Sequence, residues 1–145
     1  MESMNKPTVL ILGTHDCCRT HIVAGFMRQT AGDRLEVLTA GLQPAAEIHP
    51  LANKIMAEIK IDIAGQKPTP ASQYLGLRDI DYLITISPEA ESQCPSPVPR
   101  VAQRLHWPFE DPAALTGNEL EKIRGFRCIR NEIAYQVKTW ALALR

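Results

Sequence analysis

The chain has 145 residues, of which 45% are hydrophobic and 22% are charged, as in an ordinary soluble protein of one domain. Its 16 basic and 16 acidic residues balance, which argues against a general nucleic-acid partner but not against a local anion site. No apolar run approaches the roughly 20 residues of a membrane span, and Met1–Pro7 lacks the apolar core of a signal peptide. We therefore expect a cytoplasmic protein with no membrane partner, one domain over residues 1–145, and a flexible N-terminus over residues 1–7.

The chain contains four cysteines, Cys17, Cys18, Cys94 and Cys128. Two are adjacent and the others lie far away, which matches neither a disulfide-rich secreted domain nor the paired C-x-x-C spacing of a zinc site. We expect free thiols in a reducing compartment, with Cys128 as a small buried hydrophobic residue. The sequence predicts no cofactor.

Strand and helix signals alternate in the first half of the chain. Thr8–Gly13 is an unbroken apolar run, which suits a strand buried on both faces of a parallel sheet. Thr20–Thr30 carries apolar residues on one face and predicts a helix. Leu35–Ala40 predicts a second strand. A second helix is expected to start at Pro50, because proline fits the first helical turn.

The alternation continues in the second half. The expected elements are a short helix over Ser72–Leu77, a strand over Asp81–Ile86 stopped by Ser87 and Pro88, a short strand over Arg104–His106, a loop without regular structure over Trp107–Ala113 and a long helix over Asn118–Arg145 with one buried stripe. The whole pattern predicts an α/β fold with a parallel sheet and right-handed crossovers.

The loop after the first strand is the first candidate site, because ligands of such folds bind at the carboxyl ends of the strands. Its residues are Gly13, Thr14, His15, Asp16, Cys17, Cys18 and Arg19. Successive backbone N–H groups and the following helix N-terminus suit a small oxyanion such as phosphate, sulfate or arsenate. Arg19 can close on that anion with a bidentate contact.

The segment Val9–Arg28 resembles the opening of the low-molecular-weight tyrosine phosphatases, and still more their relatives, the thioredoxin-coupled arsenate reductases. The most specific match is Cys94-Pro-Ser96 followed by His106–Ala113, a block characteristic of the reductase branch. Shorter matches lie at Thr39–Gly41, Pro50–Ala52, Ile61–Ile63, Gly65-Gln66, Asp81–Ile86 and Phe126–Ile133. The resemblance spans roughly Thr8 to Leu144 and implies a three-layer sandwich in which helices flank a four-stranded parallel sheet.

The resemblance also implies residue roles, and the departures fall on the catalytic positions. In both subfamilies the loop begins with a nucleophilic cysteine and ends with an arginine, which is Arg19 here. Gly13 stands at the cysteine position and cannot form a covalent phospho- or arseno-enzyme. The reductase relay needs two further thiols, but Ser87 stands at one of those positions and only Cys94 matches. Asp111 matches the general acid of the phosphatases.

Several of these residues have a second interpretation. Asp16 stands where the family usually carries an asparagine, and it can either pair with Arg19, which would weaken anion binding at neutral pH, or leave Arg19 free. Asp111 can be a general acid or a carboxylate that stabilises its loop. Cys18, which matches a loop cysteine outside the relay, can form a redox pair with Cys94, but we favour two unpaired thiols.

The polar segment that contains His15, Cys17, Cys18 and His21 carries ligand types that transition metals prefer. The spacing of these residues fits no known finger or ribbon. We therefore expect a polar loop here and predict no metal site.

Two hypotheses for the function follow. The leading one is a catalytically degenerate homologue that acts by binding a small oxyanion or a protein. The alternative is an active arsenate reductase with Cys18 or Cys17 as nucleophile, Cys94 as resolving thiol and a thioredoxin-like partner. Alkylation of the loop thiols near neutral pH separates the two, because only a lowered pKa gives much thiolate there.

Overall fold

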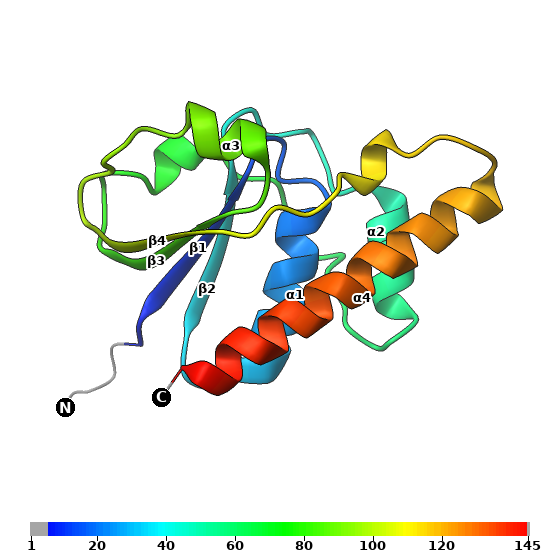
Figure 1. The fold of residues 1–145 in the computed structure, drawn as a ribbon, viewed down its shortest axis with the longest axis horizontal. Helices are drawn as coiled ribbons and strands as arrows, with labels where there is room; N and C mark the ends of the chain where they lie inside the picture. Colours follow the sequence, from blue (N-terminus) through cyan, green and yellow to red (C-terminus); the bar gives the residue numbers. More distant parts are fainter. Residues whose placement is uncertain (1–5, 145) are drawn as a thin grey trace.

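The sheet has four parallel strands, as predicted (Figure 1). The computed structural model describes residues 6–144. In chain order the strands are β1 (Thr8–Gly13), β2 (Glu36–Gly41), β3 (Ile80–Thr85) and β4 (Val101–His106). Their order across the sheet is β2-β1-β3-β4, so β1 is an inner strand, and all six of its residues are buried. The unbroken apolar run of β1 reflects this position, because helices cover both faces of the sheet.

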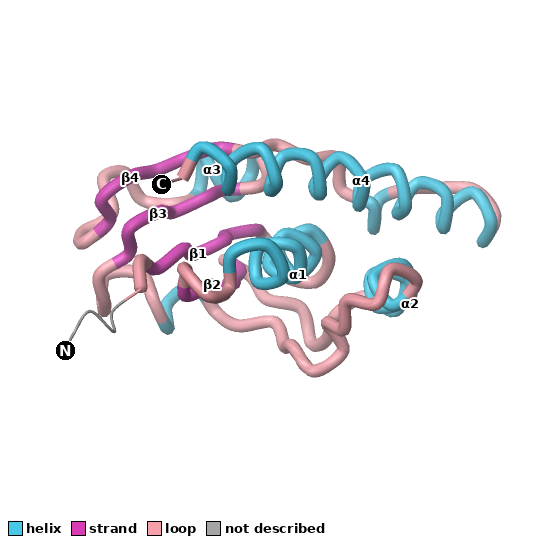
Figure 2. The backbone as a smooth tube through the Cα atoms, turned by 90° about the horizontal axis from the view of Figure 1, so that it is seen from below, coloured by secondary structure: helices cyan, strands magenta, loops and turns pink. Residues whose placement is uncertain are grey.

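Helices alternate with the strands along the chain. They are α1 (Arg19–Ala31), α2 (Pro50–Ala57), α3 (Pro88–Gln93) and α4 (Glu119–Ala143), with the 3-10 turns η1 (Ala71–Gln73) and η2 (Pro112–Ala114). Figures 1 and 2 show α1, α2 and α4 on one side of the sheet, whereas α3 and η1 lie on the other. The result is the three-layer arrangement that the sequence predicts.

Two hydrophobic cores separate these layers, because successive side chains of a strand point to opposite faces. Val9 and Ile11 of β1 pack in the core that contains α1, α2 and α4. Leu10 and Leu12 pack in the smaller core beneath α3 and η1.

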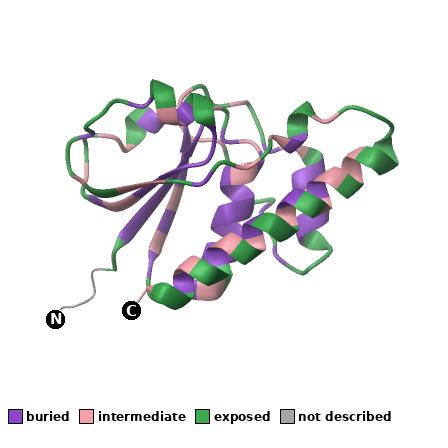
Figure 3. Ribbon diagram, in the orientation of Figure 1, coloured by how far each residue is buried: buried purple, intermediate pink, exposed green. Residues whose placement is uncertain are grey.

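Helix α4 buries one stripe, as its apolar spacing predicts (Figure 3). The buried residues are Phe126, Ile129, Ile133, Val137 and Ala141. A capping box fixes its start: the Asn118 side chain accepts from the backbone N–H of Glu121, and the Glu121 side chain accepts from the backbone N–H of Asn118. Cys128 lies on the exposed face of the helix, so the expected burial of this residue is wrong.

Helix α3 is absent from the sequence-based expectations, which treat Ser87 and Pro88 only as the end of a strand. The Ser87 hydroxyl accepts from the backbone N–H of Ala90 at 3.0 Å, which caps the new helix. Pro88 occupies the first helical turn, where its missing N–H costs nothing. The same two residues therefore end β3 and begin α3.

Other boundaries differ by a few residues. The short helix expected over Ser72–Leu77 is the 3-10 turn η1, and β4 begins at Val101 rather than at Arg104. The loop expected over Trp107–Ala113 ends in the 3-10 turn η2, which the Asp111 carboxylate caps by accepting from the backbone N–H of Ala113.

The expected flexible N-terminus over residues 1–7 falls largely outside the described residues. Within them, the Lys6 ammonium donates to the backbone carbonyl of Gly32 at 2.9 Å. No helix in the described part of the chain is long and apolar enough to cross a membrane.

We expect Phe126→Ala to lower the free energy of unfolding by about 3–5 kcal/mol, because Phe126 is 1% exposed and its removal leaves a cavity in the larger core. Tyr135→Ala on the same helix is the control, since Tyr135 is 75% exposed and should change stability by less than about 0.5 kcal/mol. Urea unfolding followed by circular dichroism measures both. Equal losses would contradict the assignment of the buried stripe.

Candidate oxyanion site

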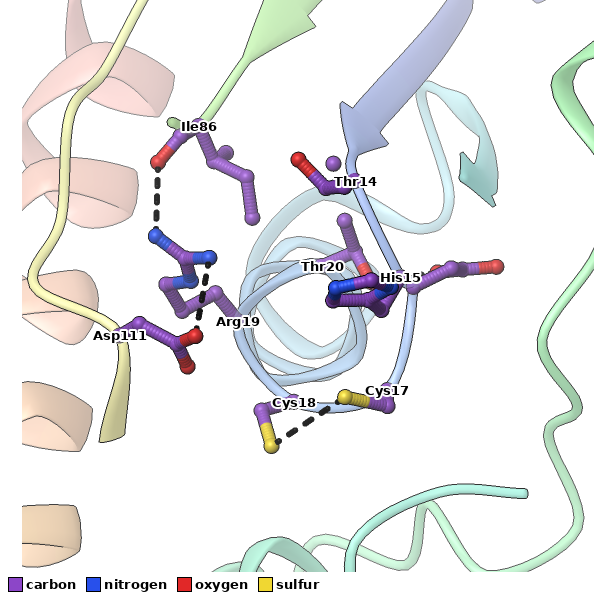
Figure 4. A pocket seen from close by; sticks show the side chains of 10 residues that line it. Thr14, His15, Cys17, Cys18, Arg19, Thr20, Ile86 and Asp111 are labelled. Atoms are coloured by element: carbon purple, nitrogen blue, oxygen red, sulfur yellow. Dashed lines mark hydrogen bonds and ion pairs between the residues drawn. The ribbon is translucent and has the colours of Figure 1, made fainter. Parts of the chain in front are cut away.

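The loop between β1 and α1 lies at the carboxyl edge of the sheet, as a ligand site of this fold requires. Gly13 ends β1 and Arg19 begins α1. A small pocket that is open to solvent lies over the loop. It is lined by all seven loop residues together with Thr20, Ile86 and Asp111 (Figure 4).

The carbonyl groups of the loop are fixed by the chain segment that follows β2. The backbone N–H groups of residues 42, 43, 45 and 49 donate to the carbonyls of Gly13, Thr14, His15 and Cys17, at 2.7 to 3.1 Å. In a trans peptide the carbonyl and the next N–H point to opposite sides. Because these carbonyls face the neighbouring segment, the N–H groups of the same peptide units point away from that segment.

Gly41 permits the close approach between this loop and the end of β2. A Cβ atom at this position would lie 2.9 Å from both the Cβ of Asp16 and the carbonyl oxygen of Thr14. Any larger residue would push the loop away from the strand.

Asp16 braces the loop from the inside, so of its two interpretations the ion pair with Arg19 is wrong. The carboxylate is buried and accepts from the Thr20 hydroxyl, the backbone N–H of Thr69 at 2.8 Å and the Thr39 hydroxyl at 3.4 Å. Its backbone has a φ of 53°, a left-handed conformation that Asp and Asn tolerate better than most residues. The carboxylate therefore satisfies buried donors and does not occupy the arginine.

His21 completes the shell around Asp16. Its Nε2 lies 3.0 Å from both the backbone carbonyl and Oδ1 of Asp16, and its Nδ1 lies 2.9 Å from Nε2 of Gln66. Arg28 donates to Oε1 of Gln66, which fixes the amide so that its NH₂ group faces the histidine. Nδ1 is then the acceptor and Nε2 carries the proton that points at Asp16.

The contacts of the two histidines also bear on whether this loop could hold a metal ion. Both ring nitrogens of His21 are engaged, and Nδ1 of His15 lies 3.0 Å from the carbonyl oxygen of Gln43. Over residues 6–144, no three side chains of the usual ligand types gather in a way that could hold a metal ion.

Arg19 points across the pocket toward the loop after β4. Its Nη1 donates to the carbonyl oxygen of Phe109 at 2.8 Å and, with a longer contact of 3.4 Å, to that of Ile86. Its Nη2 lies 3.8 Å from a carboxylate oxygen of Asp111. Figure 4 shows the guanidinium between Ile86 and Asp111. The loop after β4 thus holds Nη1, and Asp111 faces Nη2, so a ligand that displaces Asp111 would meet Nε and Nη2.

Cys17 and Cys18 form a thiol pair with unequal acidity. Their sulfur atoms lie 3.8 Å apart, Cys17 is half-buried and Cys18 is buried. The hydrogen bond from Cys18 lowers the pKa of Cys17 to about 7, and the His15 and Arg19 charges act in the same direction against burial and Asp111. The pKa of Cys18 is raised, first because its proton is held by Cys17 and second by burial. Cys17 is therefore the more acidic thiol of the pair.

The structure does not place the remaining thiol candidate beside this pair. Cys94 belongs to the core under α3, whereas Cys18 belongs to the core on the α1 face, and both are free thiols. Burial raises the pKa of Cys94. Ser87 is fully buried, and its hydroxyl lies 3.4 Å from that of Thr14.

The space around Gly13 is limited but not closed. A Cβ atom there would lie 3.0 Å from Cγ2 of Thr20 and 3.4 Å from Cδ1 of Ile86, so a side chain fits after shifts of a few tenths of an ångström. Neither neighbour is a backbone atom.

Comparison with known proteins agrees with this architecture. A family model described as low molecular weight phosphotyrosine protein phosphatase matches residues 8–145. The chain belongs to this family. Among the members, an arsenate reductase of Halalkalibacterium halodurans is 37% identical over 138 residues, which cover 95% of this chain and 97% of the relative.

Solved structures of other proteins share the fold. One is an arsenate reductase in the phosphate binding state, with a TM-score of 0.73, 23% identity and coverage of 96% of this chain and 99% of that chain. Another is the tyrosine phosphatase Wzb from Escherichia coli K30 in complex with sulphate, with a TM-score of 0.74, 17% identity and coverage of 97% and 100%.

Sequence reasoning missed the groups that hold Asp16 and Arg19. His21 and Thr20 follow Asp16 closely enough that a helix starting at Arg19 brings them back to it, which is a local signal. The carbonyl oxygen of Phe109 gives no such signal, because any residue carries one and the contact joins positions 90 residues apart.

We expect iodoacetamide to modify Cys17 faster than Cys94 at neutral pH, with a rate that rises with pH and is half-maximal near pH 7, because the thiolate is the nucleophile. Peptide mapping by mass spectrometry assigns each adduct. Cys18→Ala removes the hydrogen-bond donor and should move the Cys17 profile to higher pH. Cys18→Ser, which keeps a donor, should move it less. An unchanged profile in Cys18→Ala would refute the role of Cys18.

Proposed function

We propose that this protein binds a small tetrahedral oxyanion, such as phosphate, sulfate or arsenate, in the Gly13–Arg19 loop and forms no covalent bond to it at residue 13. The observation that carries the proposal is that four loop carbonyls bond to the neighbouring segment. The N–H groups of the same peptide units point away from that segment, and we infer that they face the pocket. Helix α1 adds the N–H groups of its first turn, which contains no acidic side chain.

The charges around the loop favour the same ligand. Arg19 supplies a cation beside the pocket, and the buried Asp16 does not neutralise it. Asp111 is the carboxylate that faces Arg19, but it is 38% exposed at a separation of 3.8 Å. Such a half-exposed pair is weak, so an oxyanion held by several N–H groups and Arg19 can displace it.

Two relatives support the ligand class. The arsenate reductase in the phosphate binding state and Wzb in complex with sulphate share the fold of this chain. Phosphate, sulfate and arsenate share a tetrahedral distribution of negative charge. Backbone N–H groups can therefore bind any of the three, and the loop alone does not show which one is the ligand.

The residues of the reductase relay argue against turnover by that route. Gly13 offers no side chain to attack an oxyanion, and Ser87 offers a hydroxyl where the resemblance places a thiol. We therefore propose a degenerate member of the family that acts through the bound anion, or through a protein partner that recognises the loaded loop. A thioredoxin-like protein stays a prediction for that partner.

A second candidate function is thiol chemistry at Cys17, which its lowered pKa favours. In this case Cys17 would attack the oxyanion and a second thiol would release the product. Cys94, the resolving thiol of this hypothesis, lies in the core on the other face of the sheet from Cys18. A relay through Cys94 would need a large rearrangement, so we place this function second.

We expect Arg19→Ala to weaken sulfate binding by about 10- to 100-fold, because a charge-assisted hydrogen bond contributes about 1.5–3 kcal/mol. Isothermal titration calorimetry on the folded protein measures the change. Arg100→Ala is the matched control, since Arg100 pairs with Asp79 on the surface and does not line the pocket. Equal affinity of Arg19→Ala and the unaltered protein would contradict the proposed site.

We expect the unaltered protein to stay at background in thioredoxin-coupled arsenate reduction and in aryl phosphate hydrolysis. Gly13→Cys should give measurable phosphatase activity, because that reaction needs only a loop thiol, Arg19 and the general-acid candidate Asp111. The same variant should not complete the reductase cycle until Ser87→Cys is added. Reductase turnover by Gly13→Cys alone would show that our account of Ser87 is wrong. Reductase turnover by the unaltered protein that is lost in Cys17→Ser would favour the second candidate.

A further inference from the structure

The sulfur atoms of Cys17 and Cys18 form a feature that oxyanion binding does not use. They lie 3.8 Å apart at the edge of the pocket. Figure 4 shows the two sulfurs beside each other, on the opposite side of the loop from Thr14 and Ile86. The oxyanion cradle is built from backbone N–H groups and Arg19, so this pair is available for a different ligand.

We propose that Cys17 and Cys18 form a dithiol site that captures a trivalent arsenical, with both sulfurs bonded to one arsenic atom. This inference goes beyond the oxyanion proposal and does not depend on it. The ligand is a neutral, sulfur-seeking species, whereas the cradle suits an anion.

The separation of the sulfurs would have to change little for a bridging atom and much for a disulfide. With bonds of about 2.3 Å, the length that thiolate ligands make to zinc, and a bond angle of about 95–110°, one atom bonded to both sulfurs would hold them about 3.4–3.8 Å apart. The observed 3.8 Å lies at the edge of that range. A disulfide would need the sulfurs at about 2.05 Å, which requires a much larger movement within two adjacent residues.

The different pKa values of the two thiols suit capture of the arsenical in two steps, first by Cys17 and then by Cys18. The lowered pKa of Cys17 supplies a thiolate near neutral pH, and Cys17 is the more exposed of the two. Cys18 keeps its proton and lies within reach of the atom that Cys17 has bonded. The first bond thus forms at the accessible sulfur and the second closes the ring.

The number of protein ligands favours the arsenical over a structural zinc ion. Trivalent arsenic needs three bonds, so two sulfurs and one group of its own complete its coordination. A structural zinc ion needs four ligands, and among residues 6–144 no group of even three candidate side chains could hold a metal ion.

The capture is a substitution in which arsenic stays trivalent. With phenylarsine oxide as its hydrate, C6H5As(OH)2, the Cys17 thiolate displaces one hydroxide, which takes up a proton to leave as water. Cys18 then forms the second arsenic–sulfur bond, and its proton leaves with the second hydroxide as water. No oxidant or reductant is consumed.

The test is a titration of the folded full-length protein with phenylarsine oxide, followed by native mass spectrometry and counting of free thiols. We expect one adduct for each chain and the loss of two thiols for each adduct. Cys17→Ser and Cys18→Ser should each bind at least about 100-fold more weakly, because the second bond is intramolecular only when both thiols are present. Cys128→Ser, at an exposed single thiol, should bind as the unaltered protein does.

Peptide mapping of the adduct on the unaltered protein keeps the test decisive if Cys18→Ser does not fold. Both arsenic–sulfur bonds should map to the peptide that contains Cys17 and Cys18, and excess dithiol should reverse the adduct where the same concentration of monothiol does not. Consumption of one thiol for each adduct, mapping to Cys94 or Cys128, or equal affinity of folded Cys17→Ser would overturn the proposal. Sulfate affinity, measured separately, reports on the cradle alone, so the two proposals can fail independently.

Discussion

The buried carboxylate of Asp16 is the constraint on which the geometry of the site depends. It gathers donors from α1, from β2 and from the segment before η1, namely the Thr20 hydroxyl, the Thr39 hydroxyl and the backbone N–H of Thr69. Leaving such donors unpaired in the interior costs about 1–3 kcal/mol each. Three separate parts of the chain are thus tied to one loop residue, and the loop has little freedom to open.

The outer side of the loop is fixed by a second set of contacts. Backbone N–H groups of residues 42, 43, 45 and 49 donate to the loop carbonyls, and Gly41 lets the two segments approach. Neither set of contacts involves a side chain at residue 13. The shape of the loop is therefore physically separable from the nucleophile that the resemblance places at Gly13, and a chain can keep the first without the second.

The sequence predicts the fold well because the spacing of apolar residues identifies each strand or helix from its own residues, and the alternation of strands and helices indicates a parallel sheet. The buried run of β1 and the stripe of α4 could be identified from their own residues. Helix α3 could not, because six residues carry too little periodicity and its start depends on the Ser87 cap. Residue type alone places Cys128 in the core, but this position lies outside the buried stripe of α4 and faces solvent.

The candidate site shows the same division between local and long-range signals. The positions of the loop residues follow from the β1–loop–α1 order, but the direction of the Asp16 side chain does not. Sequence distance favours Arg19 as its partner, since only three positions separate them. The left-handed backbone at Asp16 instead turns its carboxylate toward Thr69, 53 positions away. Arg19 then finds its acceptor at Phe109, 90 positions away. Thr20 and His21 are local partners of Asp16, but tertiary packing sets the other partners of Asp16 and Arg19. The electrostatics of the loop therefore depend on the assembled sheet and cannot be predicted from the loop sequence alone.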